Sequence, residues 1–123
     1  METLKNQHSY MVARLAKPGE DIIKDLTPEK AHLWHMASCA QSEAGELFDA
    51  IKRPAIYNKG SYDRKNVVEE LGDIEFYLEG IRQGLGITRE ETLQANMEKL
   101  GVRYASGTYS NEQAQARADK VSE

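Results

Sequence analysis

The fold of this chain is decided by residues 33–51, which read LWHMASCAQSEAGELFDAI. Apolar or small residues recur there in steps of four and three, the spacing of a helix that lies along another helix. They are Leu33, Ala37, Ala40, Ala44, Leu47 and Ile51. The same steps recur in VVEELGDIEFYLEGIRQGL, residues 67–85, through Val67, Leu71, Ile74, Leu78, Ile81 and Leu85. The sequence therefore predicts two long helices packed as an antiparallel hairpin, and we call the row along which they meet the seam.

Two pairs of carboxylates lie next to these apolar positions. Glu43 and Glu46 are three residues apart, and so are Glu70 and Asp73, so each pair shares one face of its helix. Each pair begins one residue before an apolar position, and we therefore expect the acids on one flank of the seam. The pairs also lie at similar distances from the connection near residue 58, so an antiparallel hairpin brings them level with each other.

Four carboxylates at one level repel each other unless a cation lies between them. A ligand set made only of oxygen atoms suits a hard ion such as Mg²⁺ or Mn²⁺. The alternative interpretation is a solvated acidic surface, because the chain has 20 Asp and Glu residues in total.

Local signals predict the ends of the helices. Thr27 and Pro28 start the first long helix, which runs to about Lys52 ahead of Pro54. Residues 54–62 are expected to connect it to the second long helix, which Asp63 caps and which ends at residues 84–86. Shorter helices are expected over residues 3–16, through Ile22 and Ile23, after the capping box at Thr88 and after that at Ser110. We predict one all-α domain over residues 1–123.

The overall composition restricts the function classes. The net charge is −4 and no Lys/Arg cluster occurs, which argues against a nucleic-acid-binding surface. Cys39 is the one cysteine, so an intramolecular disulfide framework is excluded and a packing role is expected. No apolar run of membrane length and no signal peptide is found, which predicts a cytoplasmic protein without a membrane partner.

A third group of residues suits phosphate. Asn96, Lys99 and Arg103 follow the i, i+3, i+7 spacing and share one helix face. An amide and two cations on one face can bind phosphoryl oxygens and neutralise charge near a metal. Lys59 and Arg64, near the connection, are weaker phosphate candidates. The alternative is again a solvated charged face.

Together these motifs resemble the MazG-like, all-α nucleoside triphosphate pyrophosphohydrolases. The signature of that family is Glu-x-x-Glu, a spacer, and Glu-x-x-Asp, and the spacer here is 23 residues long. Asn-x-x-Lys-x-x-x-Arg-Tyr follows downstream, ending at Tyr104, although Ala105 stands where many members carry proline. The resemblance covers roughly residues 30–119 and is closest to the short single-domain members often found in phages and bacteria.

The resemblance implies a reaction and its residues. A nucleoside or deoxynucleoside triphosphate is cleaved between its α and β phosphates, giving the monophosphate and pyrophosphate. The implied Mg²⁺ ligands, with Mn²⁺ as a possible substitute, are Glu43, Glu46, Glu70 and Asp73. The implied phosphate-binding residues are Asn96, Lys99 and Arg103, and we group Tyr104 and Lys59 with them. A dimer or a tetramer with the active site near the subunit interface is also implied.

Apolar residues outside the hairpin seam point to assembly as well. Val68, Phe76 and Tyr77 add apolar surface that one helix partner does not cover, so we expect hairpins of two or more subunits to form a bundle. Two alternatives to the NTP hydrolase stay open. One is a helical oligomerisation or partner-binding module without catalysis, and the other is a metal-dependent hydrolase of another pyrophosphate ester.

Overall fold

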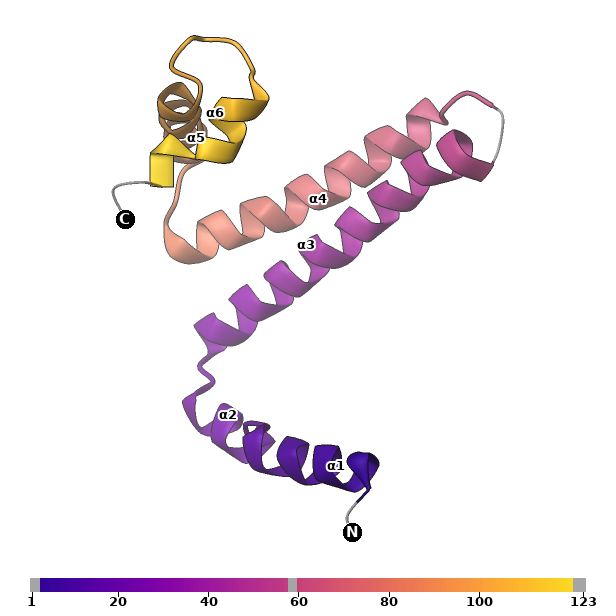
Figure 1. Cartoon of the computed structure of the whole chain (residues 1–123), viewed down its shortest axis with the longest axis vertical. Coiled ribbons are helices and arrows are strands. Elements are labelled where there is room, and N and C mark those ends of the chain that lie inside the picture. The colour runs from indigo at the N-terminus through magenta and orange to yellow at the C-terminus, as the bar shows by residue number, and fades with distance from the viewer. Residues whose placement is uncertain (1–2, 58–59, 121–123) are drawn as a thin grey trace. The chain divides into compact units, whose positions relative to one another are not determined.

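The computed structural model describes residues 3–57 and 60–120, and its secondary structure there is helical, without a strand (Figure 1). The all-α prediction is therefore confirmed. Lys59, a phosphate candidate, lies outside the described residues. The chain divides into two units, Met1–His32 and Leu33–Glu123, which are described separately.

The first unit contains α1, Leu4–Leu15, and α2, Gly19–Asp25, and it ends within the first turns of the next helix. The Thr3 side chain caps α1 by accepting a hydrogen bond from the Asn6 backbone N–H at 3.2 Å. Pro18 separates the two helices, because α2 begins directly after this proline. None of residues 3–32 is buried, so this unit has no core of its own.

The first long helix, α3, spans Pro28–Lys52. Its start agrees with the prediction, since the Lys30 N–H donates to Thr27 Oγ1 at 3.2 Å. Its end also agrees with the predicted end at about Lys52, but Arg53–Tyr57 then forms a π-helical turn, η1, where we expected the connection to begin. Pro54 has no N–H to donate to the carbonyl four residues earlier, so the α-helical ladder is interrupted there and the backbone widens.

The second unit continues with α4, Arg64–Leu85, α5, Arg89–Arg103, α6, Asn111–Ala116, and the 3₁₀ turn η2, Ala118–Lys120. The predicted caps of these helices are confirmed. Each cap side chain accepts a hydrogen bond from the backbone N–H three residues later in the chain, and these caps are Asp63, Thr88 and Ser110. Gly86 ends α4 with φ 68°, a left-handed conformation that glycine adopts without strain.

Within the second unit, α3 and α4 lie side by side and run in opposite directions (Figure 1). Among the described residues only Met36 is buried, with 8% of its surface exposed. It lies against Gly80 of α4. The interior between the two helices is therefore narrow and depends on small residues.

The seam itself differs from the expected one. The observed row of less exposed positions on α3 is Leu33, Met36, Ala40, Glu43, Leu47 and Ala50, with Cys39 beside it. On α4 the observed row is Val67, Glu70, Ile74, Tyr77, Ile81 and Gly84, with Gly80 beside it. The expectation that the acids only flank the seam is thus wrong for Glu43 and Glu70, which lie within it. On each helix, half of the expected positions also belong to the observed row. A rotation of each helix by roughly 50° about its axis converts the expected row into the observed row.

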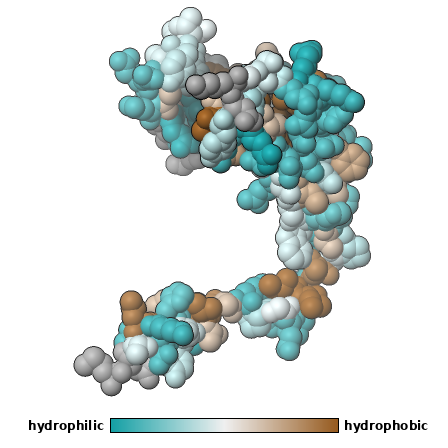
Figure 2. Space-filling view, turned by 90° about the vertical axis from the view of Figure 1, so that its right-hand side faces the viewer, coloured by the Kyte–Doolittle hydropathy of each residue, from teal (hydrophilic) through white to brown (hydrophobic). Residues whose placement is uncertain are grey.

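This rotation leaves leucines on the outside of α4. Leu71, Leu78 and Leu85 are 48%, 37% and 53% exposed. Hydrophobic side chains reach the surface in both units (Figure 2). Even so, no helix in the described part of the chain has the length and apolarity needed to span a membrane.

Candidate functional site

Three of the four predicted acids meet between α3 and α4. Glu43 of α3 and Glu70 and Asp73 of α4 each place one carboxylate oxygen within 4.8 Å of the other two. The two helices run in opposite directions, so residues far apart in the sequence become neighbours, and the i, i+3 spacing adds Asp73 to the same face. Glu43 and Glu70 are half-buried, whereas Asp73 is exposed. We call these three residues the acidic cluster.

Glu70 is the residue whose surroundings most clearly fit a cation. Its Oε2 atom is buried and has no hydrogen-bond partner among the described residues. Burial raises the pKa of Glu70, and the charges of Glu43, Asp73 and Glu46 raise it further. An ionised carboxylate in this position is unfavourable unless positive charge is added. The donor set consists only of oxygen atoms, so it fits a hard divalent cation such as Mg²⁺ or Mn²⁺.

Glu46 lies beside the acidic cluster. It is exposed, and it lines a cavity of about 230 Å³ together with Asp49, Ala50, Arg53, Asn66 and Glu70. Asp49 and Asn66 were not among the residues predicted from the sequence. Their spacing contained a signal, because Asp49 follows Glu46 by three residues and Asn66 precedes Glu70 by four. Asp49 also pairs with Arg53 at 3.8 Å.

A second cavity, of about 400 Å³, adjoins the other side of the cluster. It is lined by Glu43, Gly72, Asp73, Phe76 and Tyr77. The two aromatic rings lie 5.0 Å apart and nearly perpendicular. Electrostatic interaction with Cys39 raises the pKa of Tyr77, as does burial. Cys39 is half-buried beside Tyr77 in the seam, in agreement with the packing role we expected.

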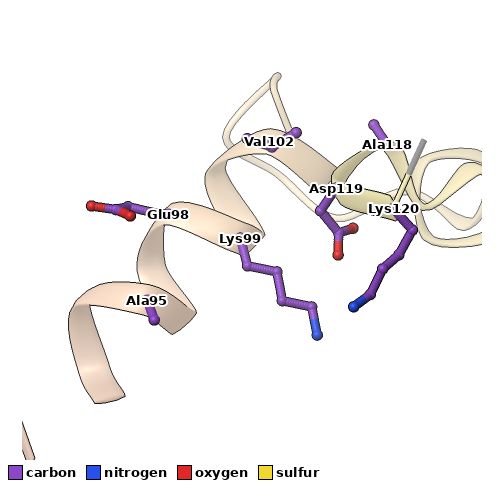
Figure 3. A pocket seen from close by; sticks show the side chains of 7 residues that line it. All are labelled: Ala95, Glu98, Lys99, Val102, Ala118, Asp119 and Lys120. Carbon is purple, nitrogen blue, oxygen red and sulfur yellow. The ribbon is translucent and has the colours of Figure 1, made fainter. Parts of the chain in front are cut away.

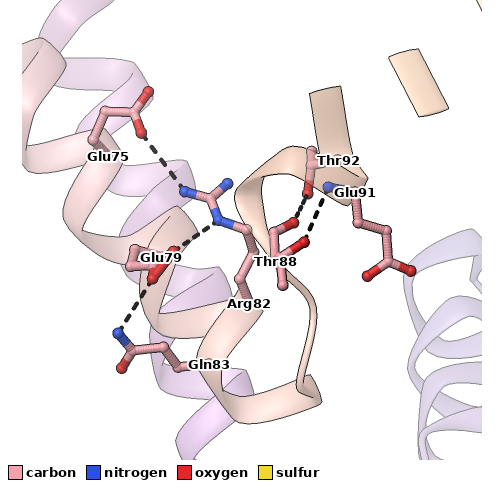
Figure 4. A network of polar contacts seen from close by, with 7 residues as sticks. All are labelled: Glu75, Glu79, Arg82, Gln83, Thr88, Glu91 and Thr92. Carbon is pink, nitrogen blue, oxygen red and sulfur yellow. Dashed lines mark hydrogen bonds and ion pairs between the residues drawn. The ribbon is translucent and has the colours of Figure 1, made fainter. Parts of the chain in front are cut away.

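Other carboxylates of α4 already have cationic partners. Arg82, whose side chain is only 12% exposed, pairs with Glu79 at 2.9 Å and with Glu75 at 3.7 Å (Figure 4). Gln83 donates a further hydrogen bond to Glu79 at 3.2 Å. The hydrogen bonds from Arg82 and Gln83 lower the pKa of Glu79. Glu75 and Glu79 are thus each paired with Arg82, whereas the charged neighbours that shift the pKa of Glu70 are all acidic.

The predicted phosphate-binding residues lie on α5, but Arg103 is already paired. Its Nε donates to Asp119 Oδ1 at 2.8 Å, and its Nη2 donates to Oδ2 at 3.3 Å. The side chains are 18% and 6% exposed, respectively. Tyr104, the C-terminal cap of α5, has its ring 5.7 Å from that of Tyr109. The sequence contained no signal for the Asp119 contact, because sixteen residues separate the partners.

Lys99 extends from α5 into a cavity of about 420 Å³ beside Asp119. The cavity is lined by Ala95, Glu98, Lys99, Val102, Ala118, Asp119 and Lys120. The Lys99 side chain reaches towards it from α5, and the Lys120 side chain reaches towards it from η2 (Figure 3). None of the four predicted metal ligands is among these lining residues. In the described part of a single chain, the carboxylates and Lys99 therefore line different cavities.

Residues 33–107 match the family model described as MazG nucleotide pyrophosphohydrolase domain. This chain belongs to the MazG family. The match contains all four predicted metal ligands as well as Asn96, Lys99 and Arg103, whereas Asp119 lies beyond it. Comparison with curated proteins and with solved structures gives no match. MazG proteins are nucleotide pyrophosphohydrolases that generally depend on divalent metals, and the acidic cluster is a group of residues that could hold such an ion.

Proposed function

We propose that this MazG protein is a Mg²⁺-dependent pyrophosphohydrolase of nucleoside or deoxynucleoside triphosphates. Cleavage between the α and β phosphates would release the monophosphate and pyrophosphate. One observation carries the proposal: oxygens of Glu43, Glu70 and Asp73 converge within 4.8 Å, and Glu70 Oε2 is buried without a hydrogen-bond partner. We also propose that residues 1–123 form one domain and that the protein acts in the cytoplasm.

The proposed metal ligands are Glu43, Glu46, Glu70 and Asp73. A bound Mg²⁺, or Mn²⁺ in its place, would polarise the phosphoryl group and make the attacking water more acidic. Glu43 or Glu46 would orient this water and accept its proton, since both carboxylates lie beside Glu70 and neither forms an ion pair with a described residue as Glu79 does.

Asn96, Lys99 and Arg103 would bind the phosphates and stabilise the charge that develops as the bond breaks. Tyr104 and Lys59 are included as further substrate contacts. Because the carboxylates and Lys99 line different cavities, we propose that assembly into a homodimer or a tetramer brings the carboxylates and the α5 cations together near a shared interface. The exposed leucines of α4 would be covered in that assembly.

Pyrophosphate release tests the proposed function. Purified protein is incubated with Mg²⁺ and a panel of ribonucleoside and deoxynucleoside triphosphates, and pyrophosphate is measured. We expect release by the wild type and loss of release in Glu70→Gln. Glu69→Gln is the matched control, because Glu69 is an exposed residue next to Glu70 and lies outside the acidic cluster. Equal activity of the two variants would contradict the assignment of the cluster.

The same preparation separates the two alternatives. A helical interaction module without catalysis would show no rise in melting temperature on adding Mn²⁺ and no pyrophosphate release. A hydrolase of another pyrophosphate ester would show the Mn²⁺ response and release phosphate compounds only from such esters, which are therefore included in the panel.

A further inference from the structure

Asp119 is an almost fully covered carboxylate that touches the cationic face of α5. Its side chain is 6% exposed, and its two oxygens accept hydrogen bonds from two different nitrogens of Arg103. Charge-assisted contacts with this fork geometry restrict the orientation of a guanidinium group as well as stabilising it. Lys99 also acts on Asp119 electrostatically, so both α5 cations lie within the influence of the same carboxylate.

Asp119 contacts only the Nε side of the guanidinium; its hydrogen bonds and, to a lesser extent, the neighbouring Tyr104 raise the pKa of Arg103. Asp119 occupies the Nε side, through Nε–H and one N–H of Nη2. The opposite end of the group carries both N–H bonds of Nη1 and the second N–H of Nη2. Two N–H groups at that end are the arrangement that binds two oxygens of a phosphate. An arginine held in this way loses little conformational freedom when the phosphate binds.

We propose that Asp119 is the positioning residue of Arg103, holding the Nε side of the guanidinium so that its Nη1–Nη2 end meets the phosphates of the substrate. This inference rests on the proposed function and adds to it a residue from beyond the matched family region. Asp119 acts through Arg103 and does not touch the substrate. A purely structural pair, which only fastens η2 to α5, would affect stability and leave phosphate binding unchanged.

A double-mutant cycle in the full chain tests this role. The variants are Asp119→Asn, Arg103→Ala and the double variant. Asp21→Asn is the control, because Asp21 forms an exposed pair with Lys24 at 3.7 Å. Each protein is assayed for KM and kcat with a nucleoside triphosphate, and for binding of inorganic tripolyphosphate with Mg²⁺ by calorimetry. The Mn²⁺-induced rise in melting temperature monitors the acidic cluster independently.

We expect Asp119→Asn to weaken tripolyphosphate binding and raise KM by about tenfold, with a smaller change in kcat. The Mn²⁺ response should stay at the wild-type value. In the Arg103→Ala background the Asp119→Asn change should have no further effect. If circular dichroism shows that Asp119→Asn does not fold, Asp119→Glu replaces it in the cycle. This variant keeps the negative charge but shifts the carboxylate away from its two hydrogen bonds with Arg103.

Two results would overturn the proposal: an equal loss of binding from Asp119→Asn in both backgrounds, or unchanged binding in a less stable Asp119→Asn protein. A wild type that shows the expected coupling in tripolyphosphate binding but releases no pyrophosphate would contradict the proposed function and support the positioning role. A wild type that releases pyrophosphate, with Asp119→Asn matching Asp21→Asn, would contradict the positioning role alone. Absence of both binding and release would contradict both.

Discussion

Gly80 of α4 lies against the side chain of Met36 of α3, so closely that a Cβ atom at position 80 would overlap the Met36 sulfur and lie 3.0 Å from its Cγ. Met36 is the buried residue of the seam, and the contact lies far from the connection between the two helices. The glycine therefore allows α3 and α4 to pack together at the end of the hairpin where no loop joins them.

Gly80→Ala should be less stable than Gly72→Ala. Replacing glycine in a helix interior by alanine gains about 1 kcal/mol from helix propensity. At Gly72, where no atom lies within 4 Å of the added methyl group, that gain should be observed. At Gly80 the overlap with Met36 should offset it and make this variant less stable than Gly72→Ala by about 1–2 kcal/mol. Urea unfolding measures both, and equal stabilisation would contradict the packing described.

Asp73→Asn should abolish pyrophosphate release and leave the fold intact. Asp73 is exposed at the edge of the acidic cluster, so its replacement opens no cavity and removes one of the mutually repelling charges. Circular dichroism should show wild-type helicity, whereas the Mn²⁺-induced rise in melting temperature should be lost or reduced. Near wild-type turnover in this variant would contradict the proposed metal site.

Lys99→Ala should weaken substrate handling more than metal binding. Lys99 lines the cavity beside Asp119 and none of the proposed metal ligands lines it, so its loss removes positive charge only from the phosphate side. We expect KM to rise by about tenfold. Lys65→Ala, an exposed lysine of α4, controls for the change in net charge. If Lys99→Ala weakened Mn²⁺ binding as much as it weakened substrate handling, Lys99 would instead be a structural support of the helices that carry the acidic cluster.

The pair of Asp119 and Arg103 should make stability depend on acid pH. The hydrogen bond from Arg103 is the main reason that the pKa of Asp119 lies below its usual value. The unfolded chain therefore takes up the proton at a higher pH than the folded chain does, and protonation favours unfolding. The stabilisation from this pair is complete above the usual pKa of aspartate. It is lost as the pH falls through the lowered pKa of Asp119 in the folded protein. Unfolding midpoints measured from about pH 6 to about pH 3 should show a smaller decrease in Asp119→Asn than in the wild type.

Light scattering at micromolar concentration should show a homo-oligomer that Leu78→Glu dissociates. Leu71, Leu78 and Leu85 form an exposed row on α4, and a charge in its centre would have to be buried on assembly. The variant should keep its helicity and lose activity if the site forms near the subunit interface. A wild-type monomer of 13.9 kDa with full activity would contradict this assembly.

The sequence by itself determined the helices and their ends. Thr27, Asp63, Thr88 and Ser110 were predicted as caps and all accept the expected hydrogen bonds, because a cap depends only on residues within one turn. The i, i+3 spacing similarly placed each acid pair on one helix face. The exception was η1: α3 ends at Lys52 as predicted, but Arg53–Tyr57 forms a wider helical turn where a connection was expected.

Only the tertiary structure decided which helix face forms the seam and which partners meet across long separations. The apolar spacing favours the row that contains Leu71, whereas the observed row contains Glu43 and Glu70, so the rotation between the two depends on contacts between α3 and α4. The pairing of Arg103 with Asp119 likewise depends on the return of the chain from α6 to α5. Helix periodicity encodes the local spacing of side chains, whereas their neighbours on another helix are determined by how the two surfaces pack.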